Sequence, residues 1–413
     1  MREYIFYMKN IVVIGGGAAG MIAAYAASSI GNQVTLIEKN EKLGKKIYIT
    51  GKGRCNVTNN VPVADFFNNV VTNPKFVYGA VNTFPSNKLM DFLSANGLKL
   101  KVERGNRVFP ESDKASDVTK TIEKVLVNNG VDIILNTEVK AIIIEDGIVK
   151  GVKTENTTYS CDSVIVCTGG LSYPLTGSTG DGYKFAKTVG HTISPLKSAL
   201  VGIELKGAEF LELQGLSLKN VTAKAILNGK TLYEDFGEML FTHFGISGPI
   251  ILSCSSVINK HNLDEIDLVI DLKPALDCLT LDARLIREFK ENNTKLVQNA
   301  IRSLVPKNLV EIILRRASVS LNKNCSEITQ IERSRIVKSL KNLNYKVKAL
   351  RPISEAIVTS GGICVKEINP KTMESKLVKN LFFAGEVLDI DAFTGGFNLQ
   401  LAFSTGYVAG INS

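Results

Sequence analysis

The clearest chemical signal is three glycines in the hexapeptide GGGAAG at positions 15–20. Gly15, Gly17 and Gly20 have the G-x-G-x-x-G spacing, which permits a tight turn, a close backbone approach to a pyrophosphate and close packing of a helix on a strand. A helix that begins here would point unpaired N–H groups and its positive dipole end at the phosphates. Glu38 ends the next apolar run, where its carboxylate would accept hydrogen bonds from an adenosine ribose. These residues predict a site for FAD or NAD, because an acid at this position repels the 2′-phosphate of NADP.

The segments around these glycines have the pattern of a βαβ unit. Residues 10–14 are a β-branched run, residues 21–30 carry apolar side chains at helical spacing, and residues 33–38 are a second apolar run. We expect them to open a doubly wound α/β domain. Residues 131–170 are instead predicted to form short strands, with a hairpin at Asp146-Gly147 and a last strand at 163–167.

Three features favour FAD over NAD. After Glu38 the chain continues into a long loop segment, and the short strands of 131–170 interrupt the doubly wound pattern. The third feature is the C-terminal sequence FFAGEVLDIDAFTGGFNLQLAFSTG, in which a predicted strand at 380–385 precedes a Gly395-Gly396 turn and a helix over 397–410. The N-terminus of such a helix can stabilise the negative charge of a reduced flavin. The alternative is that this last strand and helix only complete the sheet. No second G-x-G-x-x-G motif indicates a separate nicotinamide domain, and no C-x₄-C pair indicates a disulfide reductase.

Longer segments, in order along nearly the whole chain, resemble the YhiN-like flavoproteins, also described as the aminoacetone-oxidase or BaiN-like family of FAD-binding enzymes. These segments are GGGAAGMIAA, EKNEKLGKKIYITGKGRCNVTN, GGLSYPLTGSTGDGY, GEMLFTHFGISGP, GGICVKEINPKTMESK and NLFFAGEVLDIDAFTGGFNLQLAFSTG. The resemblance implies an α/β fold of the two-dinucleotide-binding flavoprotein type, with a Rossmann-like FAD domain from residues 1–195 and 366–413. It implies an inserted β-barrel-like substrate domain from 196–278 and 346–365, and a helical subdomain from 279–345.

The residue patterns agree with this organisation. Residues 199–275 alternate like strands and contain an Asn228-Gly229 hairpin signal, whereas residues 280–343 have helical periodicity. Pro306 is placed to start one of these helices. The expected architecture is therefore a β-rich and helical insertion within an FAD domain.

The resemblance also implies cofactor contacts at matching positions. The glycines of GGGAAG, with Ala18 and Ala19, would meet the pyrophosphate, and Glu38 would meet the ribose. Residues near the flavin, the ribityl chain or the pyrophosphate would be Lys39, Lys45, Gly53, Arg54, Asn56, Thr58, Thr168, Gly169, Asp181, Gly385 and Glu386. Val139 would meet the adenine through its backbone, and the backbone N–H groups of Asn398 and Leu399 would face the flavin. One departure is Cys167, which replaces the alanine of the usual ATGG sequence.

Two side chains could take part in the reaction. Cys55 follows Arg54, whose charge favours a thiolate, although a small packed residue in a tight loop is the alternative. His243, in FTHFGISGP, is a candidate general acid or base, with a structural hydrogen-bonding role as the alternative.

The composition describes a globular protein. The 413 residues carry a net charge of +9 with a pI near 9.0, which suits an anionic partner. Seven scattered cysteines without C-x-x-C spacing favour a reducing cytosol, and no His or Cys cluster has metal-ligand spacing. The apolar segment 18–30 is too short to cross a bilayer, and the first ten residues lack the core of a signal peptide, so we expect a cytoplasmic protein.

The expected function is an FAD-dependent oxidoreductase that transfers a hydride between flavin N5 and a small organic substrate. Oxidation of an amine or aminoketone and reduction of an enone both stay open, as does recycling of the flavin by O2 or by NAD(P)H. The alternative is an RNA-associated flavoprotein that uses the basic residues of the helical insert; a non-catalytic FAD-binding protein is a third. A solvated helical face explains the same charges, so nucleic acid is not the expected partner. The oligomeric state stays open.

Overall fold

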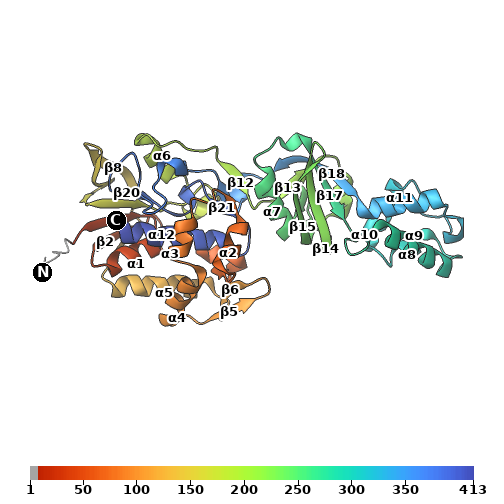
Figure 1. The fold of residues 1–413 in the computed structure, drawn as a ribbon, viewed down its shortest axis with the longest axis horizontal. Helices are drawn as coiled ribbons and strands as arrows, with labels where there is room; N and C mark the ends of the chain where they lie inside the picture. Colours follow the sequence, from red (N-terminus) through yellow and green to blue (C-terminus); the bar gives the residue numbers. More distant parts are fainter. Residues whose placement is uncertain (1–7) are drawn as a thin grey trace. The chain divides into compact units, whose positions relative to one another are not determined.

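The computed structural model describes residues 8–413, which form two compact units (Figure 1). The first unit contains the described residues up to Ser198 together with Ile353–Ser413, and the second is Ala199–Pro352. Residues 353–365, predicted to belong to the insertion, lie with the first unit because Ser194 N donates to the carbonyl oxygen of Gly362 at 2.8 Å. A separate helical subdomain at 279–345 stays a prediction.

A five-stranded parallel sheet lies at the centre of the first unit. Its order is β20-β11-β1-β2-β7, with β20 at Leu381–Phe383, β11 at Ser163–Val166, β1 at Asn10–Ile14, β2 at Gln33–Ile37 and β7 at Asp132–Ile134. Val12 of β1 pairs with Val164 on one side and with Thr35 on the other. The βαβ unit and the strands predicted near 163 and 380 are therefore confirmed as parts of one Rossmann-like sheet.

Helix α1 (Ala18–Ser29) packs against the C-terminal helix α12 (Phe397–Asn412), as Figure 1 shows. A Cβ atom on Gly406 would lie 2.3 Å from the carbonyl oxygen of Ala19, and one on Gly410 would lie 2.4 Å from that of Ala23. Glycine is required at both positions because the two backbones approach so closely. The first and last helices of the chain thus share one interface.

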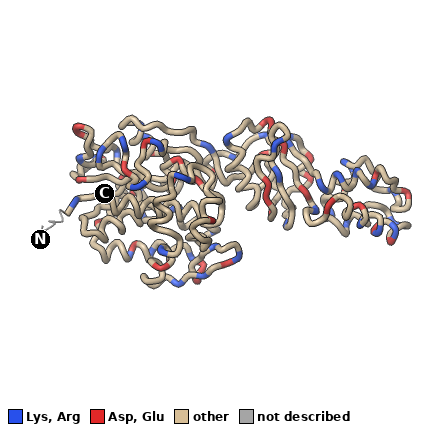
Figure 2. The backbone as a smooth tube through the Cα atoms, viewed as in Figure 1, with Lys and Arg blue, Asp and Glu red and all other residues tan. Residues whose placement is uncertain are grey.

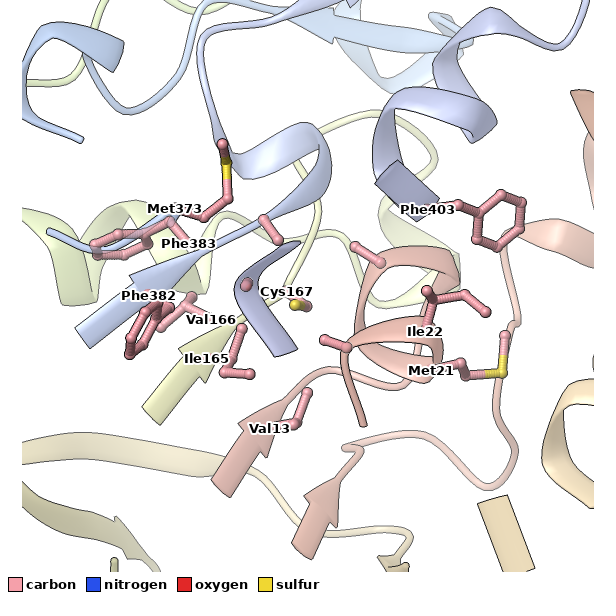
Figure 3. Packing of buried hydrophobic residues seen from close by; sticks show 14 of the residues in the cluster. Val13, Met21, Ile22, Ile165, Val166, Cys167, Met373, Phe382, Phe383 and Phe403 are labelled. Atoms are coloured by element: carbon pink, nitrogen blue, oxygen red, sulfur yellow. The ribbon is translucent and has the colours of Figure 1, made fainter. Parts of the chain in front are cut away.

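The core of the first unit joins the sheet to these helices (Figure 3). Val13, Ile165, Val166, Phe382 and Phe383 come from three neighbouring strands, and each is 5% exposed or less. Met21 and Ile22 of α1 and Phe403 of α12 are fully buried on the helices. Apolar side chains from both ends of the chain therefore form one core.

The remaining elements of the first unit flank this core. The predicted Asp146-Gly147 turn is confirmed, with φ of 50° and 74°, and it joins two strands of a three-stranded antiparallel sheet. These strands are β8 (Val139–Glu145), β9 (Ile148–Thr154) and β10 (Thr158–Ser160). The stretch after residue 57, for which no pattern was assigned, forms β3 (Thr58–Asn59), α2 (Val63–Phe66), β4 (Val70–Thr72), α3 (Tyr78–Thr83), α4 (Ser86–Ala95), β5 (Leu100–Glu103), β6 (Arg107–Pro110) and α5 (Ala115–Asn128). Helix α6 spans Asp181–Thr188.

A closed six-stranded barrel lies in the second unit, as predicted, and its last strand follows the helices of that unit. Its order is β13-β16-β15-β14-β17-β18, with β13 at Ile203–Leu205, β16 at Gly245–Ser247, β15 at Lys230–Phe241, β14 at Ser217–Leu227, β17 at Ile266–Asp271 and β18 at Leu343–Leu350. The Asn228-Gly229 hairpin joins β14 to β15. Helix α7 (Pro249–Ile258) was missed, because its β-branched sequence is apolar on nearly every side and shows no helical period.

Four helices follow the barrel strand β17, as the periodicity predicted. They are α8 (Cys278–Glu291), α9 (Val297–Ile301), α10 (Lys307–Arg316) and α11 (Gln330–Lys341). Pro306 occupies the N-cap of α10, one position before the expected first turn. From residue 8 onwards, no helix combines the length and the apolar character that a membrane crossing requires.

Candidate cofactor site

The glycine turn between β1 and α1 has the geometry that its spacing predicts. Gly15 has φ of 100°, and a Cβ atom there would lie 2.6 Å from the carbonyl oxygen of Cys167. A Cβ on Gly20 would lie 1.8 Å from the carbonyl oxygen of Gly15, so this position also requires glycine. A Cβ on Gly17 would meet nothing within 4 Å. The turn is therefore closed against the protein at Gly15 and Gly20 and open at Gly17.

The first turn of α1 offers donors on this open side. Met21 N donates to the carbonyl oxygen of Gly17 at 2.9 Å, and no side chain caps the helix. Across residues 8–413, no acceptor is found for the N–H groups of Ala18, Ala19 and Gly20. Such groups bind phosphate oxygens well because they combine hydrogen bonding with the positive end of the helix dipole.

Glu38 holds the glycine turn and the loop after β2 together. Its Oε2 atom accepts a hydrogen bond of 2.7 Å from Gly16 N, and its Oε1 atom accepts bonds from the backbone and side-chain nitrogens of Asn40. Glu38 is 8% exposed. Because a carboxylate has about four acceptor positions, a hydroxyl donor could still be accommodated. The segment before Val139 adjoins this site, since Thr137 N donates to the carbonyl oxygen of Glu38 at 3.0 Å.

Two predicted carboxylates form ion pairs with lysines. Asp181, at the start of α6, lies 2.6 Å from Lys39 Nζ. Burial raises the pKa of Asp181, but hydrogen bonds led by that from Lys39 outweigh burial and leave the pKa lowered. Glu386 lies 3.1 Å from Lys46 Nζ, and it also accepts bonds from the Thr359 N–H and the Ser172 hydroxyl. These acids anchor their loops.

The pKa of Glu386 follows the same balance. Burial raises it, and the opposing charge of Lys46 with the hydrogen bonds leaves it below the usual value for a glutamate. Lys45, predicted near the cofactor, instead pairs with Glu41 at 3.1 Å and lies 3.3 Å from Asn40 Oδ1.

Other predicted positions surround the N-terminus of α1. A Cβ on Gly385 would lie 2.8 Å from the Cβ of Ala19, and Gly385 N donates to the Thr405 hydroxyl. Thr168 accepts a bond of 3.1 Å from Gly182 N, and Gly169 has φ of 71°. The C-terminal AGE sequence and the CTGG turn thus reach the same end of the parallel sheet, where dinucleotides bind.

The loop TGKGRCN bends sharply after residue 50. Gly51, Lys52, Gly53 and Cys55 all have φ between 57° and 86°. The guanidinium of Arg54, predicted to line the flavin, is bound by Glu103 and Asp113 and lies 4.2 Å from the ring centroid of Phe109. In this structure Arg54 fixes the loop through protein partners.

Cys55 is fully buried and has the packed role that was the alternative to a reactive thiol. Burial raises the pKa of the Cys55 thiol to about 12, and a hydrogen bond with Thr50 offsets this only in part. A thiol with this pKa is protonated at neutral pH, so it is a poor nucleophile.

Strand β3 lies directly against the start of α12. Thr58 Oγ1 donates to Gln400 Oε1 at 2.7 Å, and Asn59 Nδ2 donates to the carbonyl oxygen of Gly395 at 3.0 Å. A Cβ on Gly396 would lie 2.5 Å from the carbonyl oxygen of Thr58. The loop and the C-terminal helix are therefore tied together at a position where only glycine fits.

This junction leaves polar groups available to a cofactor. Gln400 N is the first amide of α12 with a carbonyl partner, Gly396 O at 3.1 Å, and residues 8–413 supply no acceptor for the N–H groups of Asn398 and Leu399. The buried Oδ1 atoms of Asn56 and Asn59 have no hydrogen-bond donor in the same part of the chain. The Asn398 side chain is used internally, since it bonds both N and O of Ala392. Unpaired buried acceptors and open helix N-termini fit a bound FAD, whose ring and phosphates supply the missing partners.

His243 lies in the second unit, in the turn between β15 and β16. It is exposed in a hollow of about 590 Å³, with Arg351, Lys348 and Glu204 among the lining residues. Its ring contacts Phe244 edge-on at a centroid distance of 5.1 Å. An exposed imidazole can exchange a proton with solvent, so the structure is compatible with both roles considered for it.

Several residues of the site were not predicted. Lys46 and Ser172 hold Glu386, and Asn59 and Gln400 hold the start of α12. Their partners lie more than 100 residues away in sequence, so no local pattern marks them. The available signal was that all four lie inside segments that resemble known flavoproteins.

Comparison with known proteins gives one family. The model of the HI0933-like protein Rossmann domain matches residues 9–412. The chain is 32% identical over 409 residues to the 3-dehydro-bile acid delta(4,6)-reductase of Clostridium scindens, covering 98% of each chain. It is 31% identical over 413 residues to the ribosomal RNA dihydrouridine synthase of Haemophilus influenzae, again covering 98% of each.

A solved structure shows the same fold at low identity. The 3-ketosteroid delta1-dehydrogenase from Sterolibacterium denitrificans has a TM-score of 0.53 and 13% identity, with 98% of each chain covered. One assignment follows from the glycine turn, from the open N-termini of α1 and α12, and from the relatives that match nearly the whole chain. The chain belongs to the HI0933-like Rossmann family, and it is an FAD-dependent oxidoreductase.

Proposed function

We propose that the protein reduces a carbon–carbon double bond conjugated to a carbonyl group, with NAD(P)H as the source of electrons for its FAD. Support comes from the names of two relatives. The 4,6-double bonds of a 3-oxo bile acid and the 5,6-double bond of uracil are both conjugated to a carbonyl. At the 5,6-double bond of uracil and at the 4,5-double bond of the steroid, a hydride adds to the β-carbon and a proton adds to the α-carbon. The 6,7-double bond of the steroid is conjugated through the 4,5-double bond and takes its hydride at the δ-carbon, so the dienone needs two hydrides and two protons before both double bonds are saturated.

The observation that carries the proposal is the open N-terminus of α12. The N–H groups of Asn398 and Leu399 have no acceptor in the described structure, and the strand residues Thr58 and Asn59 hold the helix in place. In the proposed binding mode this helix end would lie where negative charge develops on a reduced flavin, and its partial positive charge would stabilise that charge. FAD, when bound, supplies the hydride, and this helix end favours the reduced form that donates it.

The other residues of the site bind and orient the cofactor. The N–H groups of Ala18, Ala19 and Gly20 bind the pyrophosphate, and Glu38 orients the ribose while it keeps the glycine turn closed. The buried Oδ1 atom of Asn56 accepts a hydrogen bond from a cofactor N–H group. We assign His243 as the candidate donor of the proton to the α-carbon.

Anaerobic flavin titration tests this function. The visible absorbance of the oxidised flavin should bleach on addition of NADH or NADPH, and it should return when a conjugated enone is added. Bleaching by an aminoketone, with recovery only on admission of O2, would establish the oxidase reaction in place of the reductase. A preparation without flavin absorbance would contradict both reactions.

Substitution of His243 tests the proton donor. His243→Asn should lower the rate of enone reduction, because that reaction needs a proton at the α-carbon. Reduction of the flavin by NAD(P)H needs no such proton and should be unchanged. His261→Asn is the matched control, since His261 is also an exposed histidine of the second unit. Equal enone turnover in the two variants would remove His243 from the mechanism.

A further inference from the structure

The first unit contains few arginines, and they lie in one region. Residues 8–198 and 353–413 include 23 lysines but only three arginines. Arg54 belongs to the loop TGKGRCN, and Arg104 and Arg107 belong to the hairpin of β5 and β6. Figure 2 shows basic residues on this hairpin, whose strands Figure 1 labels. What distinguishes this region is therefore the guanidinium group, a planar fork of donors that fits phosphate oxygens and stacks on aromatic rings.

The ring of Phe109 joins the loop to the hairpin. The guanidinium carbon of Arg54 lies 4.2 Å from the ring centroid, and that of Arg107 lies 5.8 Å from it. A Cβ on Gly51 would lie 3.5 Å from Phe109 Cε1, so the loop backbone also reaches this ring. Arg107 Nε donates to the carbonyl oxygen of Arg104 at 3.1 Å, which holds the Arg107 side chain over the turn of the hairpin. These contacts place the three arginines together.

The three arginines differ in their partners. Arg54 is half-buried, and its guanidinium is bound by the carboxylates of Glu103 and Asp113. Arg104 and Arg107 are exposed, and no carboxylate between residues 8 and 413 lies within ion-pair distance of either. We call Arg104 and Arg107 the arginine pair. Arg54 holds the loop in place, whereas the arginine pair can bind a ligand.

The arginine pair adjoins the flavin end of the candidate cofactor site. Asn59 Nδ2 donates to the carbonyl oxygen of Gly105, in the turn of the hairpin, at 3.0 Å. The same nitrogen donates to the carbonyl oxygen of Gly395, in the turn before α12, also at 3.0 Å. One buried side chain therefore links the turn between the two arginines to the helix whose open N-terminus faces the flavin in the proposed binding mode.

We propose that the arginine pair binds the phosphates of the nicotinamide dinucleotide that reduces the FAD. The inference rests on the proposed function in one respect, because it takes NAD(P)H as the source of electrons. A nicotinamide that stacks on the flavin ring leaves the phosphates of its dinucleotide at the rim of the site, beside the arginine pair. Guanidinium groups bind phosphate oxygens through two parallel N–H···O bonds. The pyrophosphate, which NADH and NADPH share, and the 2′-phosphate of NADPH both have this chemistry.

The charge of the arginine pair matches a dinucleotide better than it matches a carboxylate. A pyrophosphate carries negative charge on each of its phosphates, so both guanidiniums gain a partner. A carboxylate carries a single charge and would leave one guanidinium without a partner. The pyrophosphate of FAD already has donors in the N–H groups of Ala18, Ala19 and Gly20. A second dinucleotide is therefore the ligand that the arginine pair fits best.

Calorimetry with the FAD-loaded full chain tests the proposal without a redox reaction. The ligands are ADP-ribose, which carries the pyrophosphate, and 2′-phospho-ADP-ribose, which carries the 2′-phosphate as well. The variant combines Arg104→Gln and Arg107→Gln. The control combines Lys150→Gln and Lys153→Gln, which are exposed lysines of β9 and lower the net charge equally.

We expect the variant to bind 2′-phospho-ADP-ribose at least about tenfold more weakly, because each lost bond joins two charged groups. The control should bind it as the original does. An equal loss for ADP-ribose would identify the pyrophosphate as the bound group, and unchanged binding of ADP-ribose would identify the 2′-phosphate. Arg104→Gln alone should weaken binding by about threefold. The Arg104 side chain has no hydrogen bond or ion pair with described residues, so this single substitution leaves the fold intact.

Rapid mixing of the oxidised protein with NADPH or NADH gives a second measurement. The dinucleotide concentration that half-saturates flavin reduction should rise in the variant by the factor seen in calorimetry. The limiting rate at saturation should be unchanged, because the arginine pair binds phosphates and does not touch the reacting atoms.

Three outcomes would overturn the proposal. Equal binding by the variant and the control would show that the arginine pair binds neither phosphate group. A folded variant that has lost its FAD would assign the hairpin to the FAD site. A lower limiting rate with unchanged half-saturation would place the arginines at the reacting atoms.

Enone reduction by flavin that has been reduced with dithionite keeps this test separate from that of the proposed function. This reaction needs no dinucleotide, so the variant should carry it out at the original rate. Weaker dinucleotide binding in the variant, in a protein that reduces no enone, would contradict the proposed function and leave the arginine pair standing. Enone reduction in a protein that binds neither ligand would overturn the role of the arginine pair and retain the reduction.

Discussion

Around the candidate cofactor site, half-buried basic side chains are paired with carboxylates, whereas seven of the basic side chains on α8–α11 are not. In the first unit, Lys39 pairs with Asp181, Lys46 with Glu386, and Arg54 with Glu103 and Asp113. On α8–α11, six cations are paired, and seven exposed ones have no carboxylate within ion-pair distance among the described residues, namely Arg287, Lys290, Lys295, Arg302, Lys307, Arg335 and Lys338. The two regions use the same residue types for different purposes.

The difference follows from burial. A cation next to a buried site must be matched, because an unpaired charge there costs several kcal/mol of desolvation. Paired cations cannot move, so those of the first unit hold loops in place around the cofactor. Exposed cations stay hydrated and keep a cloud of counterions, which a polyanion can displace. Substitution of the paired cations in the first unit should therefore lower stability, whereas substitution of the seven exposed cations on α8–α11 should change it little.

The largest effect is expected for Gly20→Ala in the first unit. The added Cβ would lie 1.8 Å from the carbonyl oxygen of Gly15, so the turn and α1 must move apart. We expect a loss of more than about 3 kcal/mol in the free energy of unfolding, measured by denaturant titration. Gly17→Ala is the control, because its Cβ would meet nothing within 4 Å. It should leave the apoprotein stable while weakening FAD retention; equal stability of both variants would contradict the observed packing.

A smaller effect is expected for Lys46→Met. The substitution removes the cation beside Glu386 and leaves that carboxylate with the Ser172 hydroxyl and the Thr359 N–H. We expect a loss of about 2 kcal/mol, since both members of the pair are largely buried. Lys338 of α11 is exposed and forms no ion pair with any described residue. Lys338→Met should therefore change the free energy of unfolding by less than about 0.5 kcal/mol. Thermal unfolding of the two variants measures the contrast, and equal shifts in Tm would remove the distinction between the regions.

A pH effect should also be confined to the first unit. His191 is 3% exposed, bonded to Glu367 and to Ser375, and burial lowers its pKa although Glu367 opposes this. Unfolded His191 titrates near its usual value of about 6.5, so at lower pH the unfolded chain binds more protons. The contribution of neutral His191 to the free energy of unfolding is therefore complete above the pKa of the unfolded chain. It is lost as the pH falls through the lower pKa that His191 has in the folded protein.

Unfolding measured between neutral pH and about pH 5 should therefore show a decline that His191→Gln makes shallower. The pKa of Glu367 is also lowered: burial raises it, and bonds from Thr192 and His191 outweigh burial. Its contribution is lost at more acidic pH than that of His191. An identical pH profile in the variant would assign the decline to other groups.

The smallest effect on stability is expected for four substitutions on the surface of α8 and α11. Removal of like charges at Arg287, Lys290, Arg335 and Lys338 breaks no ion pair between described residues and relieves repulsion along α8 and α11. The free energy of unfolding of the variant that carries all four substitutions to Gln should stay within about 1 kcal/mol of the original. A large loss of stability would show that these side chains belong to the fold.

Local patterns were sufficient to predict much of the fold. The glycine turn, the strands around it and the two hairpins at Asp146-Gly147 and Asn228-Gly229 each depend on residues close in sequence. Helix α7 was missed because burial on most sides removes the periodicity that marks a helix.

The site was less predictable than the fold. The roles of Asn59 and Gln400 depend on contacts between β3 and α12, more than 300 residues apart in sequence. Arg54 was predicted to contact the cofactor, but Glu103, at the end of β5, and Asp113, in the loop after β6, hold its guanidinium, and no sequence pattern indicated either partner. Which partner a charged side chain selects is decided by tertiary structure.

The contact between α1 and α12 has a consequence for biosynthesis. Gly406 and Gly410 reach Ala19 and Ala23 only after the whole inserted unit has been made. Until then β11 has no β20 beside it, and the flavin end of the site lacks its helix. The barrel and helices of the second unit, which are contiguous in the chain, can fold on the ribosome as they emerge. The predicted cofactor site is complete only once α12 has been made, so a chain that stops before Phe397 would carry the insert on an incomplete flavin site.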